Sequence, residues 1–121
     1  MTHKVLALIE RASGGDECAA TAAHLAVERN AGLILAVDPH QEPLKTLESE
    51  LSHLVGIAAK LHVPTSTMLI DMHDAQVVVR AVCCNRVDLV VLEQAAGPTD
   101  VARATMADAL HEADISVVQA R

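Results

Sequence analysis

Aromatic residues are missing from this chain: its 121 residues include no Phe, Trp or Tyr. Without aromatic rings the protein has no stacking platform for single-stranded nucleic acid and no aromatic cage for a quaternary ammonium group. Basic residues are scarce as well, because 9 Lys and Arg stand against 16 Asp and Glu and leave a net charge of -7. No cluster of Lys and Arg forms the basic footprint of a nucleic-acid or anionic-membrane surface, so we expect no nucleic-acid partner.

Long apolar runs and spaced cysteines are also lacking. No run approaches the roughly 18 residues of a membrane span, so we expect no membrane insertion. The 3 cysteines are Cys18, Cys83 and Cys84, and adjacent cysteines rarely form a disulfide with each other because the bond strains the peptide between them. This set predicts reduced thiols and a cytoplasmic location, with all of these side chains packed as small apolar groups.

The residues that are present predict one folded domain over residues 1–121. Apolar residues make up 51% and charged residues 21%, as in ordinary globular domains. Short apolar runs predict strands at Lys4–Glu10, Leu33–Val37, Val63–Ile70, Val87–Leu92 and Ile115–Val118. Helical periodicity predicts helices at Glu17–Ala31, at Leu44–Leu61, from Asp74 to Asn85, and from Pro98 to Leu110.

Particular residues predict where these helices end and which sides face inward. Asp16 is expected to cap the first helix and Gly32 to end it, while Asp74 is expected to cap the third. Leu44 should begin the apolar face of the second helix, and Val77 should face inward on the third. The alternation predicts an α/β fold: a five-stranded parallel sheet with helices on both faces, flavodoxin-like and doubly wound, whose ligands bind at the carboxyl ends of the strands.

Three segments resemble a known family in their order and pattern. The opening KVLALIE ends in the acidic Glu10, Asp74–Val77 leads into VDLVVL at Val87–Leu92, and His111–Val118 comes near the end of the chain. These are similar to the first strand, the short helix before an "aDLIVmG" strand and the closing "hAPCPVLVV" of the universal stress protein (Usp) family. The resemblance covers essentially the whole chain and implies a HUP-type sandwich with a regulatory or stress-response role.

The main departure from that family lies after the fourth strand. ATP-binding members have a signature of roughly G-x2-G-x9-G-S/T, in which glycines let backbone N–H groups approach the phosphates. Here the segment Glu93–Ala104 keeps only Gly97, and Pro98 has no N–H to donate. Near the last glycine and its hydroxyl partner stand Arg103 and Ala104. The resemblance therefore implies a member without the ATP signature, and we expect no cofactor.

By the same resemblance, a candidate cleft is lined by Glu10, Ser13, Gly14, Val37, Gly97 and Arg103. Glu10 and Glu93 should lie close together at the ends of the first and fourth strands. They are either an acid/base pair, a divalent-cation site or two solvated carboxylates. The last interpretation is favoured, because beyond Asp38 and the loops the sequence offers no evident third ligand.

Other chemistry-bearing residues show no convergent spacing. The 7 histidines include no H-x3-H pair, so scattered histidines are expected rather than a metal site. The tripeptide Met72–Asp74 is expected in a loop. Asp71 is placed like the phosphoacceptor of a response-regulator receiver, yet the acidic pair and the lysine of a receiver are lacking. Cys83 and Cys84 are expected at a helix carboxyl end, which disfavours a reactive thiolate.

We conclude from the sequence that this is a non-enzymatic module that acts through dimerisation and contacts with an unknown protein partner, without catalytic residues and without ATP. The homodimer interface is expected at Ile115, Ser116, Val117 and Val118, an edge strand without lysine or proline, which family members commonly pair with its twin. The alternatives are a nucleotide-binding member in which Arg103 contacts a phosphate, and a small-ligand or flavin-type binder that uses the cleft at Glu10 and Glu93.

Overall fold

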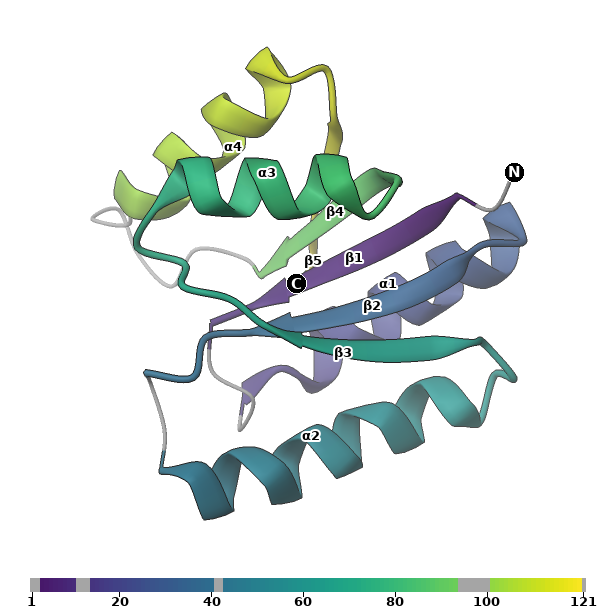
Figure 1. Cartoon of the computed structure of the whole chain (residues 1–121). Coiled ribbons are helices and arrows are strands. Elements are labelled where there is room, and N and C mark those ends of the chain that lie inside the picture. The colour runs from purple at the N-terminus through teal and green to yellow at the C-terminus, as the bar shows by residue number, and fades with distance from the viewer. Residues whose placement is uncertain (1–2, 11–13, 41–42, 94–100, 121) are drawn as a thin grey trace.

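A five-stranded parallel sheet in the order β3-β2-β1-β4-β5 forms the centre of the molecule (Figure 1). The computed structural model describes residues 3–10, 14–40, 43–93 and 101–120, without the side chains of residues 93, 101–106 and 119–120. The strands are β1 (Lys4–Ile9), β2 (Gly32–Val37), β3 (Thr65–Leu69), β4 (Val87–Glu93) and β5 (Ser116–Ala120). The helices are α1 (Asp16–Arg29), α2 (Leu44–Ala59), α3 (Ala75–Cys84) and α4 (Val101–Glu112).

The predicted five-stranded parallel sheet with helices on both faces is confirmed. The flavodoxin-like strand order is not, because β3 lies outside β2 and β4 lies next to β1, which gives β3-β2-β1-β4-β5 in place of the flavodoxin order 2-1-3-4-5. In Figure 1, α1 and α2 lie on one side of the sheet, and α3 and α4 lie on the other. No helix in the described ranges combines the length and the apolar run that a membrane span needs.

Two apolar clusters fill the space between the sheet and the helices. Along β1, Val5 and Ile9 point into the cluster under α1 and α2, while Leu6 points into the cluster under α3 and α4. The three central strands are apolar at nearly every position because both of their faces are covered. Leu, Ile, Val and Ala pack this core without aromatic side chains.

Helix α1 lies close to the sheet because its inward side consists of small residues. Its fully buried positions are Ala19, Ala22, Ala23 and Ala26. Alanine allows the helix backbone to approach the strands and also favours helix formation. This close approach fixes the start of α1 beside the carboxyl end of β1.

The predicted ends of α1 are wrong at both termini. Gly15 takes the N-cap position, and Asp16 is the first helical residue. Asn30 ends the helix in the left-handed conformation at φ 54°, because an Asn side chain tolerates that region. Gly32 is therefore free to begin β2. By contrast, the predicted cap at Asp74 is confirmed: its Oδ1 accepts a hydrogen bond of 3.0 Å from the backbone N–H of Gln76.

Several predicted inward positions are instead exposed. Leu44 is 66% exposed at the first position of α2, and Val77 is 38% exposed on α3. Val78 and Val82 form the buried stripe of that helix, so neighbouring positions turn toward solvent. The prediction of three packed cysteines is correct for Cys18 and wrong for the other two, which are exposed in the last turn of α3. The predicted start of α4 at Pro98 lies outside the described residues.

Helices α1 and α2 are joined by an exposed hydrogen bond of 2.8 Å between Nε2 of His53 and Oδ2 of Asp16. This hydrogen bond and the negative charge of Asp16 raise the pKa of His53 above its ordinary value of 6.5. Partial loss of hydration and Lys60 oppose the rise, and Glu50 adds to it. The bridge therefore contributes stability when the histidine is protonated.

We expect the His53–Asp16 bridge to stabilise the fold below about pH 6.5 and to lose this effect as pH rises through the folded-state pKa of His53. The measurement is urea unfolding of the wild type and of His53→Gln at pH 5.5 and pH 8.5. The loss of unfolding free energy in the variant should be larger at pH 5.5. His24→Gln, at an exposed position of α1, is the matched control. An equal loss at both pH values would contradict the bridge.

Candidate functional site

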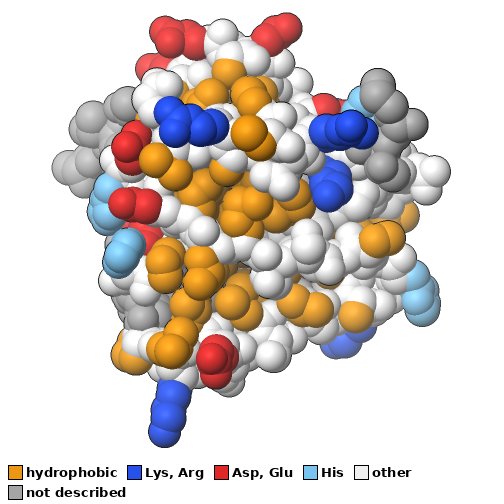
Figure 2. Space-filling model, in the orientation of Figure 1, with side chains coloured by type: hydrophobic (Ala, Val, Ile, Leu, Met, Phe, Trp, Pro, Cys, Tyr) orange, Lys and Arg blue, Asp and Glu red, His pale blue; other side chains and the backbone are white. Residues whose placement is uncertain are grey.

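The carboxyl ends of the strands bring acidic side chains to one edge of the sheet. Glu10 directly follows β1, Asp38 directly follows β2, and Asp71 comes two residues after β3. Because β1, β2 and β3 are parallel neighbours, all three residues lie at the same edge. Figure 2 shows acidic and histidine side chains together at the left of this face, where Figure 1 places the ends of β2 and β3. This is the edge where ligands bind in doubly wound sheets.

The candidate cleft residues fall on this edge where the structure describes them. Glu10 is half-buried, and Val37 is the fully buried last residue of β2. Gly14 is exposed just before α1. Ser13 and Gly97 lie outside the described residues, and Arg103 lies in α4 without a described side chain. The backbone thus places Glu10, Gly14 and Val37 at one edge, and their binding role stays a prediction.

The expected proximity of Glu10 and Glu93 follows from strand pairing. In the register between β1 and β4, Leu8 is paired with Leu92. Glu93 is the last residue of β4, and Glu10 follows the end of β1, so their backbones lie on adjacent strands. The side chain of Glu93 is not described, and the interpretation of this pair therefore rests on the sequence.

The two glycines before α1 have different surroundings. A Cβ at Gly15 would lie 2.6 Å from Cγ2 of Ile9, closer than side chains approach. Ile9 is fully buried and therefore has little room to move. A Cβ at Gly14 would meet nothing within 4 Å. Gly15 thus serves the packing of α1 against β1.

A cluster of three possible metal ligands forms beside the cleft. We call Asp38, Asp71 and His73 the Asp38 cluster; one ligand atom from each lies within 4.8 Å of those of the other two. Oδ1 of Asp38 accepts a hydrogen bond of 2.9 Å from the N–H of His40, and its Oδ2 accepts one of 3.3 Å from the N–H of Met72. The bond from Met72 holds the segment after β3 against the end of β2, and the bond from His40 fixes the turn after β2.

Spacing alone could not reveal the Asp38 cluster, since its members come from two strand ends far apart in the sequence. Met72, whose N–H reaches the carboxylate of Asp38, is 34 positions away from it. The available signal was that Asp38 and Asp71 both follow strands that a parallel sheet brings together. His73 follows Asp71 by two residues and shares its turn, in which Oδ1 of Asp71 accepts the N–H of His73 at 2.9 Å.

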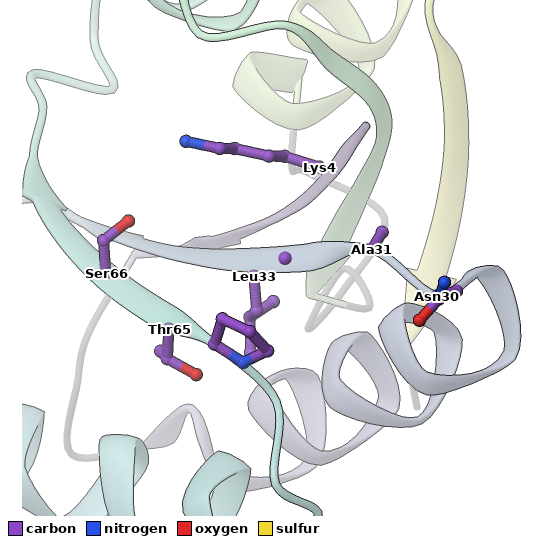
Figure 3. A pocket seen from close by; sticks show the side chains of 8 residues that line it. Lys4, Asn30, Ala31, Leu33, Thr65 and Ser66 are labelled. Carbon is purple, nitrogen blue, oxygen red and sulfur yellow. The ribbon is translucent and has the colours of Figure 1, made fainter. Parts of the chain in front are cut away.

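A cavity of about 500 Å³ opens at the opposite, amino-terminal edge of the sheet (Figure 3). It is lined by residues that include Lys4, Asn30, Gly32, Pro64, Thr65 and Ser66. Figure 3 shows Lys4 and Ser66 on one side of the sheet and Thr65 on the other. Among the described residues of the lining, Lys4 is the single charged one. The cavity lies away from the strand ends that bind ligands in this architecture.

Comparison with known proteins identifies this fold. No protein-family model and no curated protein matches the sequence. A universal stress protein solved in complex with cAMP matches with a TM-score of 0.72 at 15% identity, over 100% of this chain and 98% of that chain. The universal stress protein from Archaeoglobus fulgidus matches with a TM-score of 0.71 at 15% identity, over 100% of this chain and 99% of that chain.

A universal stress protein from Archaeoglobus fulgidus in complex with dAMP matches with a TM-score of 0.69 at 16% identity, over 100% of this chain and 98% of that chain. These matches span both chains almost completely, so the whole architecture is shared and not one βαβ unit. At such identities the likeness concerns the backbone. The chain therefore has the fold of the universal stress proteins, as the resemblance of its sequence implied.

Proposed function

We propose that this protein is a non-enzymatic, cytoplasmic regulatory module of the universal stress protein type. It acts as a homodimer joined through β5, presents its surface to a protein partner, and does not bind ATP. The observation that supports the dimer is the position of β5 at an edge of the sheet, paired with β4 on one side. An edge strand offers unpaired N–H and C=O groups to a second chain.

The composition of β5 favours pairing with another copy. Its sequence SVVQA contains no charged residue and no proline, two of the devices that protect an edge strand from pairing. Val118 is 37% exposed, and Ser116 is exposed beside it. Ile115 is buried and precedes the strand, and Val117 packs against the cluster under α3 and α4. The exposed contacts of the proposed interface therefore fall on Ser116 and Val118.

We expect Val118→Lys to convert the dimer into a monomer. Antiparallel pairing of β5 with its twin would bring two lysines near each other across the two-fold axis, where like charges repel. Light scattering of the wild type should give twice the mass of the chain, and the variant should give the mass of one chain. Circular dichroism checks that the variant is folded.

The matched control is Leu69→Lys on the opposite edge strand, β3, where the leucine is 54% exposed. This variant should stay dimeric. A monomeric wild type at micromolar concentration would contradict the proposal. So would a dimer that Leu69→Lys disrupts and Val118→Lys leaves intact, because it would place the interface at β3.

Nucleotide binding is the second candidate function, because structures of the same fold have been solved with cAMP and dAMP. The described part of the cleft favours the opposite conclusion for a triphosphate. Glu10, Asp38 and Asp71 place carboxylates at the carboxyl ends of the strands, and without a bound cation these charges repel phosphate groups. The segment after β4 with Gly97 lies outside the described residues, so this part of the proposal rests on its sequence.

A further inference from the structure

We propose that the Asp38 cluster binds one divalent transition-metal cation of the Zn²⁺ class. The side chains of Asp38, Asp71 and His73 supply one ligand atom each, and these atoms lie within 4.8 Å of one another. This site goes beyond the proposed dimeric module. It lies at the carboxyl ends of β2 and β3, whereas β5 is at the opposite side of the sheet.

Burial of Asp38 is the independent observation that favours a cation. Its side chain is 1% exposed, which makes it the only buried polar or charged residue in the described part of the chain. Its two hydrogen bonds come from neutral backbone N–H groups of His40 and Met72. No described Lys or Arg forms an ion pair with Asp38 or Asp71; the described pairs are His3–Asp88, Arg29–Asp88 and His53–Asp16. These N–H groups stabilise the buried carboxylate, and a cation would stabilise it further beside the second carboxylate of Asp71.

The geometry leaves capacity for coordination. Each carboxylate oxygen has two acceptor positions, and each oxygen of Asp38 accepts one backbone N–H. One acceptor position per oxygen therefore remains. Asp71 and His73 are exposed, so their side chains can rotate the short distance that brings ligand atoms around one ion. The hydrogen bond between Met72 and Asp38 already fixes the two backbone segments relative to each other.

The donor set selects the class of cation. Two carboxylates and one imidazole combine hard oxygen ligands with a nitrogen ligand that suits Zn²⁺, Co²⁺, Ni²⁺ and Cu²⁺ better than Mg²⁺ or Ca²⁺. Zinc is usually four-coordinate, so three protein ligands leave one position for water or a small ligand. We therefore expect stoichiometric Zn²⁺ binding and much weaker Mg²⁺ binding.

The test is calorimetric titration of chelator-treated protein with Zn²⁺ and, separately, with Mg²⁺. Because exposed thiols bind zinc, all proteins in the series contain Cys83→Ser and Cys84→Ser. The parent should bind one Zn²⁺ per chain. Asp71→Asn and His73→Gln should each weaken Zn²⁺ binding by at least about tenfold, since even partners outside the ligand set typically change affinity by that factor.

Two controls separate this site from scattered surface ligands. His24→Gln and Asp108→Asn make the same substitutions at exposed positions of α1 and α4, and they should leave the affinity unchanged. Absence of saturable Zn²⁺ binding would overturn the proposal. Equal weakening by His24→Gln and His73→Gln, or Mg²⁺ binding as tight as Zn²⁺ binding, would overturn it as well. None of these outcomes depends on the oligomeric state. The titration therefore tests the metal site, and light scattering tests the proposed dimer, independently of each other.

Discussion

Gly15→Ala is expected to lower the free energy of unfolding by about 1–3 kcal/mol, the usual effect of an extra group in a well-packed region. The added Cβ would lie 2.6 Å from Cγ2 and 3.2 Å from Cδ1 of Ile9. Ile9 is fully buried in the cluster under α1 and α2, so either its side chain or the start of α1 must move. Urea unfolding monitored by circular dichroism measures the loss.

The neighbouring variant Gly14→Ala is the matched control. A Cβ at Gly14 meets nothing within 4 Å, and neither glycine has a positive φ that alanine would strain. Its effect should stay within about 0.5 kcal/mol, as at ordinary surface positions. Equal destabilisation by the two variants would contradict the packing role of Gly15. The pair therefore distinguishes a glycine needed for packing from one that remains a candidate for the cleft.

The sheet and its order of elements were predictable from the sequence because burial on both faces produces unmistakable apolar runs. In β2, for example, Leu33–Val37 is apolar at every position, and the structure buries each of them. The confirmed cap at Asp74 was predictable for a similar reason, since its interaction is local: the bond joins residues two positions apart.

The ends of the helices were harder to predict, because left-handed residues other than glycine occur after each of them. These residues are Asn30, His62, Arg86 and Asp114, with φ values of 54°, 57°, 58° and 65°. Asn, Asp and His are enriched in this conformation, whereas Arg86 carries no such signal. Glycine is the usual marker of a helix end, and for this reason the sequence places the end of α1 at Gly32 and not at Asn30.

The candidate site was only partly predictable. The carboxyl edge followed from the topology, and Glu10 and Val37 lie there. The Asp38 cluster depends on tertiary contacts between the ends of β2 and β3, such as the bond from Met72 to Asp38. The exposure of Cys83 and Cys84 depends on the rotation of α3 about its axis, which Val78 and Val82 set by packing on the sheet.

We also expect that the wild-type protein does not bind ATP. A complex with a micromolar dissociation constant needs roughly 8 kcal/mol of binding free energy. In the segment Glu93–Ala104 only Gly97 remains of the expected glycines, and Pro98 cannot donate an N–H. A phosphate contact from Arg103 would recover about 1.5–3 kcal/mol, far less than is needed. Without a bound cation, the carboxylates of Glu10, Asp38 and Asp71 at the carboxyl ends of the strands act against a triphosphate.

The central claim is that this protein, with its universal stress protein fold, does not bind ATP. Calorimetric titration of the wild-type protein with ATP in the presence of Mg²⁺ tests this claim most directly. The titration should show no saturable heat up to millimolar ATP, and the purified protein should contain no nucleotide. Arg103→Ala should leave this result unchanged. A dissociation constant in the low micromolar range that Arg103→Ala weakens, or nucleotide that copurifies with the protein, would contradict the account and establish the remodelled loop as a phosphate site.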